Sequence, residues 1–270
     1  MWRDYCARPP PLRPLVYAMN GPTLAVIPAR LGSTRLPRKP LHIIAGRPLV
    51  EWVWRRVTIA PVVDRVVIAT DSEEIAEHAR GIGAEVELTS PRHPSGTDRV
   101  AEVARRPRYD DFPYVINIQG DEPFVDPSHL AEAVRLVRDG DWEIGTIASR
   151  LGSREEWRAP SVVKVVRGTN GAALYFSRAP VPHLRDGEPG PADFASGVLL
   201  RHIGVYAYRA AALQRWVALP EGELERMERL EQLRPLAAGM RIGVAVTDGA
   251  HGGIDTIEDA DRAELRLRAS

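Results

Sequence analysis

Apolar runs that read as buried strands alternate with amphipathic helical patterns through residues 23–140, and this alternation leaves few folds open to the chain. The predicted strands lie at 23–29, 64–71, 84–90 and 114–123, and a helical pattern follows each of them. Consecutive parallel strands need a crossover of about a dozen residues or more, which a helix supplies. The sequence therefore predicts an α/β fold, a mostly parallel sheet with helices on both faces.

The second half of the chain changes in character. Strand patterns continue at 143–151, 161–168 and 201–209, but Gly and Pro crowd residues 183–197, which we predict to be a loop. A last strand and a terminal amphipathic helix are predicted near the end of the chain. The pattern is that of one α/β domain whose second half carries additional strands.

The domain is expected to span residues 23–270, with an insert roughly within 142–215. Residues 1–22 are rich in Pro and lack apolar patterning, which predicts a disordered tail. Met19 lies just before the first predicted strand, so translation could start there rather than at Met1.

Charge balance and cysteine content exclude several classes of protein. The chain has 36 Lys and Arg against 36 Asp and Glu, so no net charge draws it to nucleic acid or to an anionic membrane. Cys6 is the only cysteine, which excludes a disulfide framework and fits a reducing cytoplasm. No apolar run approaches the roughly 18–20 residues that cross a bilayer, and the start of the chain is a poor signal peptide. We expect a cytoplasmic protein without nucleic-acid or membrane partners.

The stretch VIPARLGSTRLPRKPL at 26–41 concentrates positive charge where the first predicted strand ends. No acidic residue lies between Tyr5 and Val50, whereas seven basic residues do. A cationic loop after a strand can hold phosphates with its side chains and its backbone N–H groups. The loop matches neither the Walker A pattern nor the dinucleotide-binding glycine pattern, and a solvated loop with paired arginines is the alternative.

Two aspartates also follow strand regions, Asp121 in NIQGDEP and Asp255 in GGIDT. Mg²⁺ commonly takes one or two protein carboxylates and completes its shell with substrate phosphates and water. Taken singly, Asp121 could form a turn and Asp255 could cap the last helix. Ligands of such sheets bind beyond the carboxyl ends of the strands. We therefore expect the cationic loop, the turn QGDEP with Asp121 and the polar stretches TDSEE and TSPRHPSGTDR to meet at one rim. Two such aspartates and a cationic loop in one domain favour a metal–triphosphate site.

Lysine is almost absent from the chain. Only Lys39 and Lys164 stand among the 36 basic residues, and the others are arginine. Coding bias explains the arginines but not the two exceptions. Lysine carries a compact charge on a thin stem, whereas arginine is a wide planar fork. The two positions therefore suggest sites where a guanidinium does not fit.

Eight motifs then occur in a fixed order: VIPARLGSTRLPRKPL, TSPRHPSGTDR, NIQGDEP, SVVKVV, ALYFSRAPVP, RHIGVYAYR, LERMERLEQLR and GIDT. From about Leu24 to the end, the chain resembles the 3-deoxy-manno-octulosonate cytidylyltransferase (CMP-Kdo synthetase) family. The resemblance implies a Rossmann-like nucleotidyltransferase fold with a small dimerisation insert, and hence a homodimer. It also implies Mg²⁺-dependent transfer of CMP from CTP to the anomeric 2-hydroxyl of 3-deoxy-D-manno-octulosonate (Kdo), with release of pyrophosphate, for lipopolysaccharide or a related surface glycan.

The resemblance assigns roles to residues of each motif. The triphosphate would be held by Arg30, Arg35 and Lys39, with help from Ser33. The cytidine would be faced by Ser95, Thr97 and Gln119. The metal, one ion or two, would be bound by Asp121 and Asp255. The carboxylate of the sugar would be met by Lys164 and Arg178, and its hydroxyls by His202, Tyr206, Glu231 and Gln232.

Some of these residues could instead serve the fold. His202 and Tyr206 share one face of a predicted strand, which could equally be core, and Glu231 could lie on a solvated helix face. The chain also departs from the family at two positions. Arg38 stands where the family loop usually has Gly, and Pro235 should end or kink a helix that normally continues.

Other functions remain open at this level. The same chemistry could act on 8-amino-Kdo or on a nine-carbon sialic-type acid. A non-catalytic nucleotide-binding protein or a glycosyltransferase is an alternative of another class. A glycosyltransferase would be expected to have Asp-x-Asp at a strand end, whereas this chain has GDEP.

Overall fold

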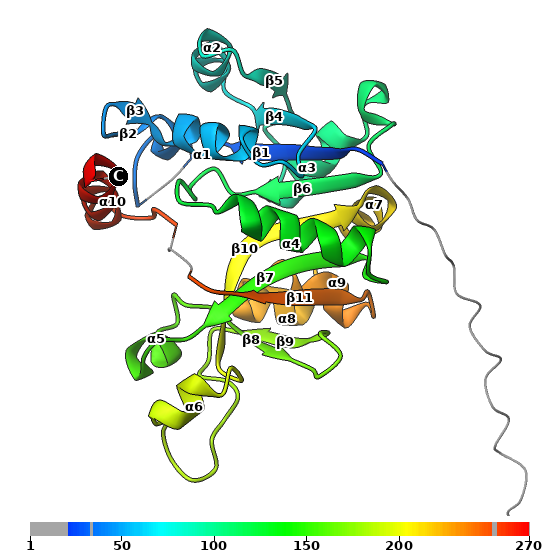
Figure 1. Cartoon of the computed structure of the whole chain (residues 1–270). Helices are drawn as coiled ribbons and strands as arrows, with labels where there is room; N and C mark the ends of the chain where they lie inside the picture. The colour runs from blue at the N-terminus through cyan, green and yellow to red at the C-terminus, as the bar shows by residue number, and fades with distance from the viewer. Residues whose placement is uncertain (1–20, 33–34, 250–252, 270) are drawn as a thin grey trace, which may run out of the picture.

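A computed structural model describes residues 21–32, 35–249 and 253–269 (Figure 1). Residues 1–20 of the predicted tail, and with them the choice between Met1 and Met19, lie outside the described residues. The strands of the main sheet are β1 (Thr23–Ala29), β4 (Arg65–Thr70), β5 (Glu85–Leu88), β6 (Tyr114–Ile118), β7 (Ile144–Arg150), β8 (Lys164–Arg167), β9 (Ala173–Ser177), β10 (Leu200–Arg209) and β11 (Ile242–Thr247). A separate short hairpin pairs β2 (Ile43–Ile44) with β3 (Arg47–Pro48).

Helices fill most of the connections between the strands. They are α1 (Leu49–Thr58), α2 (Glu73–Gly81), α3 (Gly96–Ala104), α4 (Pro127–Arg138), α5 (Arg154–Arg158), α6 (Pro191–Ala195), α7 (Ala210–Ala218), α8 (Glu223–Glu228), α9 (Leu233–Ala237) and α10 (Ile257–Ala269), with 3₁₀ turns η1 (Lys39–Leu41) and η2 (Pro107–Tyr109). Ser72, Ser95 and Asp126 begin α2, α3 and α4 by accepting a hydrogen bond from a backbone N–H of the first turn. None of the described helices is long and apolar enough to cross a membrane.

The main sheet runs in the order β11-β7-β10-β6-β1-β4-β5, with β8 and β9 attached beside β10. The pairs β1–β4, β1–β6, β4–β5 and β7–β11 are parallel. Strand β10 is antiparallel to β6 and to β7. The sheet is therefore mostly parallel, as the sequence predicts, and one reversed strand joins its two parallel parts.

The core lies on both faces of this sheet. Leu24 and Val26 of β1 pack in a buried cluster with α3 and α7, whereas Ala25 and Ile27 pack in a second cluster with α1, α2 and α4. Successive strand residues point to opposite faces, so one apolar strand supplies both clusters. The helices therefore cover both faces, as predicted.

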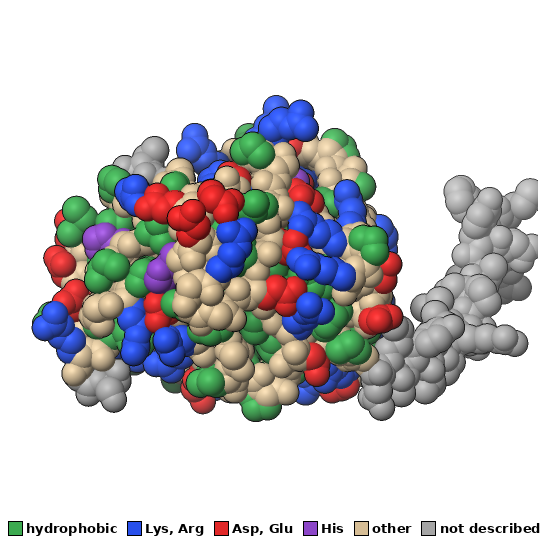
Figure 2. Space-filling model, turned by 90° about the horizontal axis from the view of Figure 1, so that it is seen from above, with side chains coloured by type: hydrophobic (Ala, Val, Ile, Leu, Met, Phe, Trp, Pro, Cys, Tyr) green, Lys and Arg blue, Asp and Glu red, His purple; other side chains and the backbone are tan. Residues whose placement is uncertain are grey.

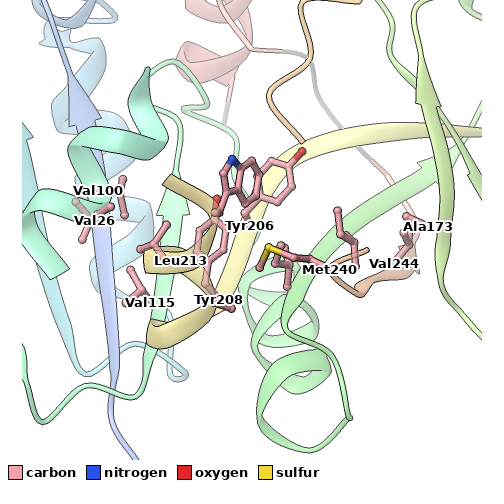
Figure 3. Close-up of a cluster of buried hydrophobic side chains, with 14 of the residues drawn as sticks. Val26, Val100, Val115, Ala173, Tyr206, Tyr208, Leu213, Met240 and Val244 are labelled. Atoms are coloured by element: carbon pink, nitrogen blue, oxygen red, sulfur yellow. The ribbon is translucent and has the colours of Figure 1, made fainter. Parts of the chain in front are cut away.

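The first cluster includes aromatic side chains of β10. Tyr206 and Tyr208 stack with ring centroids 6.0 Å apart, close to Leu213 in Figure 3. The ring of Trp216 meets both tyrosines edge-on. Aromatic pairs of this geometry add to the energy of area burial, so β10 is firmly fixed to α7.

The expected insert contributes to two different parts of the molecule. Strands β7 and β10 lie inside the main sheet, whereas α5, β8, β9 and α6 lie together at the end of the molecule opposite α2 and β5 (Figure 1). Residues 191–195, predicted as loop, form the short helix α6. Gly190 and Asp193 cap it locally, because the Asp193 carboxylate accepts the Gly190 N–H at 2.8 Å.

The helix predicted over 223–234 is interrupted, and Pro235 is not the cause. Helix α8 ends where Arg229 adopts a left-handed backbone, with φ 51° and ψ 51°. Pro235 lies inside the first turn of α9, where a backbone N–H has no partner within the helix. The expectation that Pro235 ends the helix is thus wrong: it helps to begin the next one.

Candidate active site

A cavity of about 450 Å³ opens beyond the carboxyl ends of β1 and β6. The predicted rim is found for the cationic loop, the Gln119–Asp121 turn and the start of α3, which all line the cavity. The stretch TDSEE does not line it, and the segment before α10, with Asp255, does. The residues singled out from the sequence that line it are Arg30, Arg35, Lys39, Ser95, Gln119, Asp121, Glu231 and Asp255. Ser33 lies outside the described residues.

The two aspartates meet on a single cation. Lys39 Nζ donates to Asp255 Oδ1 at 2.8 Å and also contacts Asp121 Oδ2 directly. Arg35 pairs with the other oxygen of Asp255 at 3.0 Å. Burial alone would lower the pKa of Lys39, but the two carboxylates outweigh it and raise this pKa. Burial would likewise raise the pKa of Asp255, and Lys39 and Arg35 lower it instead. Lys39 and Asp255 are therefore both ionised at neutral pH.

The backbone before Lys39 explains how the lysine reaches the acids. Arg38 has a left-handed conformation, with φ 56° and ψ 33°, and Leu36 and Pro40 are buried on either side. Glycine adopts this conformation without steric cost, whereas an arginine adopts it at some cost in energy. The Arg38 side chain contacts Glu74 at the start of α2 and not the two acids. Arg38 therefore shapes the loop through its backbone.

A close backbone approach places Asp121. A Cβ on Gly120 would lie 2.8 Å from the carbonyl oxygen of Pro28, so only glycine fits between β1 and the Gln119–Asp121 turn. The Asp121 carbonyl in turn accepts the N–H of Ile254 at 2.9 Å. The two segments that carry the acids are thus joined directly.

The acids suit a hard divalent cation. Their oxygens converge on Lys39 Nζ, so a positive charge already stands between them. Among the described residues, no group of three or more His, Cys, Asp or Glu side chains is arranged to hold a metal. Two carboxylates with an open side match Mg²⁺, which keeps waters and takes substrate phosphates as further ligands. The donor set therefore fits a metal that arrives with a polyphosphate.

A third acid, Glu122, follows Asp121 in the same turn. Burial, and then the neighbouring charge of Asp121, raise the pKa of Glu122 to about 8. Its N–H donates to the carbonyl oxygen of Gln119 at 3.2 Å, which closes the turn. Glu122 is therefore largely protonated at neutral pH, and the negative charge of the turn is carried by Asp121.

Of the residues expected to face the cytidine, Gln119 and Ser95 line the cavity and Thr97 lies behind it. The Ser95 hydroxyl is engaged at the start of α3, donating to Asp98 Oδ2 at 2.7 Å. Thr97 is buried and donates to Glu231 Oε2 at 2.8 Å. Burial raises the pKa of Glu231, and the Thr97 hydroxyl partly offsets this. Glu231 is therefore held at the cavity wall and is not a solvated helix residue.

The other residues expected to bind sugar hydroxyls lie deeper in the protein. His202 Nε2 is 2.9 Å from the hydroxyl of Thr146, and burial lowers the pKa of His202 to about 3. Its ring centroid is 5.3 Å from that of Tyr206, whose hydroxyl is buried without a hydrogen-bond partner among the described residues. Gln232 is also buried. The structure places these three side chains outside the lining of the cavity, with His202 neutral.

Lys164 is not brought to the cavity at all. Its side chain is fully buried, and Nζ donates to three backbone carbonyls, those of Ala159, Val162 and Arg178, at 2.9, 2.6 and 2.7 Å. Burial lowers its pKa. The contacts join the start of β8 to the end of β9, which is a structural role and leaves no donor for a sugar carboxylate.

Arg178 is similarly engaged. Its guanidinium donates to the carbonyl oxygens of Glu228 at 2.8 Å and Pro160 at 3.0 Å. Its own N–H donates to the Glu228 carboxylate. Its Nη2 also donates to the carbonyl oxygen of Arg229 at 3.4 Å. The side chain, which is partly exposed, thus links β9 to the end of α8 and does not line the cavity.

Two residues of the cavity wall were missed in the assignment from the sequence. Arg99 is buried, contacts Thr89, and donates to Asp71 Oδ2 at 3.0 Å. His93 contacts Glu102. Both line the cavity and both stand in the motif TSPRHPSGTDR. Their place in a polar stretch after a strand was the signal that could have identified them.

A rim with clustered cations and two paired acids, at the carboxyl ends of a mostly parallel sheet, is the arrangement expected of a nucleotidyltransferase. A model of the family described as cytidylyltransferase matches residues 24–242. The 3-deoxy-manno-octulosonate cytidylyltransferase of Gemmatimonas aurantiaca is 50% identical over 242 residues, which cover 90% of this chain and 93% of that protein. That of Halorhodospira halophila is 49% identical over 249 residues, with 91% and 96% covered.

A solved structure agrees with these relatives. It is described as CMP:2-keto-3-deoxy-manno-octonic acid synthetase complexed with CTP, and it matches with a TM-score of 0.83 and 35% identity, over 92% of this chain and 99% of that chain. The chain belongs to the cytidylyltransferase family and, within it, to the 3-deoxy-manno-octulosonate cytidylyltransferases. The family and the fold class predicted from the motifs are thereby confirmed.

Proposed function

We propose that the protein transfers CMP from CTP to the anomeric 2-hydroxyl of Kdo, giving CMP-Kdo and pyrophosphate, for lipopolysaccharide or a related surface glycan. The observation that carries this proposal is the meeting of Asp121, Asp255 and Lys39 beside Arg35 at the edge of the sheet. Relatives at 49–50% identity that are named for this activity support it. The chemistry follows from the charges of this cluster.

The reaction is an in-line displacement at the α-phosphorus of CTP. The sugar hydroxyl loses its proton to solvent and forms a bond to that phosphorus, while the bond between this phosphorus and the oxygen that bridges to the β-phosphate breaks, and pyrophosphate leaves with that oxygen. Positioning and neutralisation of charge account for most of the catalysis in such transfers. Arg30, Arg35 and Lys39 hold the triphosphate and the departing pyrophosphate. Asp121 and Asp255 would hold Mg²⁺, and the bound metal would supply neutralisation of phosphate charge and would favour ionisation of the attacking hydroxyl.

The sugar lies against the wall formed by Glu231. Glu231 accepts from a sugar hydroxyl, and Gln232, His202 and Tyr206 complete the polar network from behind. Arg178, which is partly exposed, meets the sugar carboxylate.

Two further parts of the proposal concern assembly and location. The protein forms a homodimer through the part of residues 142–215 that projects from the main sheet, where Leu174 is 59% exposed and Val198 is 59% exposed. It acts in the cytoplasm, which a single cysteine fits. Figure 2 shows cationic and acidic side chains interspersed over one face, which fits a small-molecule substrate better than a nucleic acid.

Pyrophosphate release tests the function. The protein is incubated with CTP and Mg²⁺ and with one sugar acid at a time: Kdo, 8-amino-Kdo or a nine-carbon sialic-type acid. Release is expected with Kdo at a kcat/KM at least about tenfold above the other acids, since tenfold corresponds to one well-placed polar contact. Release only with another acid would keep the chemistry and change the substrate, whereas no release with any acid would contradict the proposal.

A further inference from the structure

Asp259 lies in the first turn of α10 and is bonded to the backbone of Asp255. One oxygen of its carboxylate, Oδ2, accepts the N–H of Asp255 at 3.0 Å and the N–H of Thr256 at 2.9 Å. The N–H of Asp259 donates back to Thr256 Oγ1 at 3.2 Å. These reciprocal bonds form a capping box. Its unusual consequence is that the residue before the cap, Asp255, is held by the same carboxylate.

The other oxygen of Asp259 is used separately. Oδ1 contacts the exposed guanidinium of Arg262, one turn further along α10. This contact leaves Oδ2 directed at the two backbone N–H groups. Partners on both sides thus fix the orientation of the Asp259 carboxylate. Because this carboxylate accepts the N–H of Asp255, it also fixes the backbone of Asp255.

The residue on the other side of Asp255 is fixed as well. Ile254 is 1% exposed and packs in a cluster with Ile44, Ala260 and Ala263. Its N–H donates to the carbonyl oxygen of Asp121 at 2.9 Å. Asp255 therefore projects from a short segment that is anchored to the other acid on one side and to Asp259 on the other.

We propose that Asp259 is a positioning residue for the metal-binding carboxylate of Asp255. The inference rests on the metal site of the proposed function. Partners that orient a metal-binding carboxylate commonly affect metal affinity by about 10- to 100-fold when they are removed. An ordinary helix cap would affect only folding stability. Metal affinity and thermal stability therefore separate the two roles.

The experiment measures Mn²⁺ binding to the full chain by titration calorimetry, and Tm for the same samples. Mn²⁺ suits the same oxygen ligands as Mg²⁺. Asp259→Ala is expected to weaken Mn²⁺ binding about 10- to 100-fold and to lower Tm by a few degrees. Asp259→Asn keeps an oxygen acceptor and is expected to restore the affinity to within about threefold of the unaltered chain. Asp261→Ala removes an exposed acid of the same helix and serves as the matched control, with wild-type affinity expected.

The experiment separates failure of the inference about Asp259 from failure of the proposed function. If Asp259→Ala lowers Tm but binds Mn²⁺ with wild-type affinity, Asp259 is only a helix cap and the inference is overturned. If Asp261→Ala weakens binding as much as Asp259→Ala, the effect is one of bulk charge and the inference is also overturned. If the unaltered chain binds Mn²⁺ no better than Asp121→Asn does, the metal site of the proposed function fails, and the inference fails with it.

Discussion

The two lysines of the chain lie in different surroundings, which shift the pKa of the ammonium group in opposite directions. Lys39 stands in an open cavity between the carboxylates of Asp121 and Asp255. Lys164 is fully buried among three backbone carbonyls at the junction of β8 and β9. Carboxylates raise the pKa of the first against the effect of its burial, and burial lowers the pKa of the second. The same side chain thus serves chemistry at one site and architecture at the other.

The difference shows what the scarcity of lysine means. Three carbonyls can surround a compact ammonium, whereas a planar guanidinium would overfill that space. A compact ammonium also fits between two carboxylates, and its flexible stem allows it to move when phosphate arrives. At both positions the compact shape of the ammonium group explains why lysine is present, although the two lysines have different functions. Substitutions in the two regions test this contrast, from the largest expected effect to the smallest.

Asp121→Asn tests the chemical side of the contrast. It removes one negative charge from the metal site with little change in shape, and we expect kcat to fall about 10³-fold or more. Tm should stay within a few degrees of the unaltered chain, because the side chain is partly exposed and keeps one oxygen acceptor. Steady-state pyrophosphate release and a melting curve check both points. Turnover close to that of the unaltered chain would remove Asp121 from the site.

Lys164→Met tests the architectural side. The methionine fills the space but removes the ammonium donor from three carbonyls, of which that of Ala159 still accepts the Val162 N–H. We therefore expect the free energy of unfolding to fall by about 3 kcal/mol. Urea unfolding measures it. The kcat of the folded fraction at low temperature should change little. A stable variant with greatly reduced kcat would instead place Lys164 in the chemistry.

Lys39→Arg keeps the charge and changes the shape. The guanidinium cannot occupy the position between the two carboxylates without moving them, so we expect kcat/KM for CTP to fall about 10- to 30-fold. Stability should be nearly unchanged, in contrast to Lys164→Arg, which should destabilise the fold by about 1–3 kcal/mol through overpacking. A silent Lys39→Arg variant would remove shape as the shared explanation.

The lowered pKa of His202 makes the stability of the fold depend on pH. Its pKa is lowered to about 3 by burial, against 6.5 when unperturbed. Between these values the unfolded chain binds the extra proton and the folded chain does not, so stability falls as pH falls below about 6.5. His202→Gln should reduce that loss by about 1.5 kcal/mol between about pH 6.5 and pH 5. Parallel pH profiles of unfolding for the two proteins would show that His202 titrates normally in the folded state.

Two substitutions of Arg38 test the backbone conformation of the loop that carries Lys39. Arg38→Gly and Arg38→Ala both lose the contact with Glu74, and they differ in their tolerance of the left-handed backbone. We expect the glycine variant to be more stable than the alanine variant by about 1 kcal/mol. Chemical denaturation of the pair measures the difference. An alanine variant of equal or greater stability would mean that the loop relaxes out of this conformation.

Patterning predicted the parallel part of the fold because each strand is a short apolar run with a helix after it. The rim followed from the rule that such strands end at one edge, which predicted that the loop with Lys39 would meet the turn with Asp121. The role of Asp255 beside them was implied by the family resemblance. The reversed strand β10 could not be placed in the same way, since alternation along a strand does not specify its neighbours. Its position between β6 and β7 depends on pairings distant in the sequence.

Side-chain environments were the least predictable part of the site. Lys164 stands in a family motif, and nothing in SVVKVV shows that carbonyls of other segments surround its ammonium. The break at Arg229 has no glycine or proline to mark it, and Pro235 marks a position that only begins the next helix. Asp259 looks like an ordinary first-turn acid until its bond to the Asp255 N–H is seen.

The fate of the CTP phosphates tests the proposed transfer of CMP most directly. CTP labelled with radioactive phosphorus at the α-phosphate or at the γ-phosphate is incubated with the protein, Kdo and Mg²⁺, and the products are separated. We expect the α label in the CMP-sugar and the γ label in pyrophosphate, in equal amounts. The γ label in inorganic phosphate, or an α label that never joins the sugar, would contradict the proposed transfer.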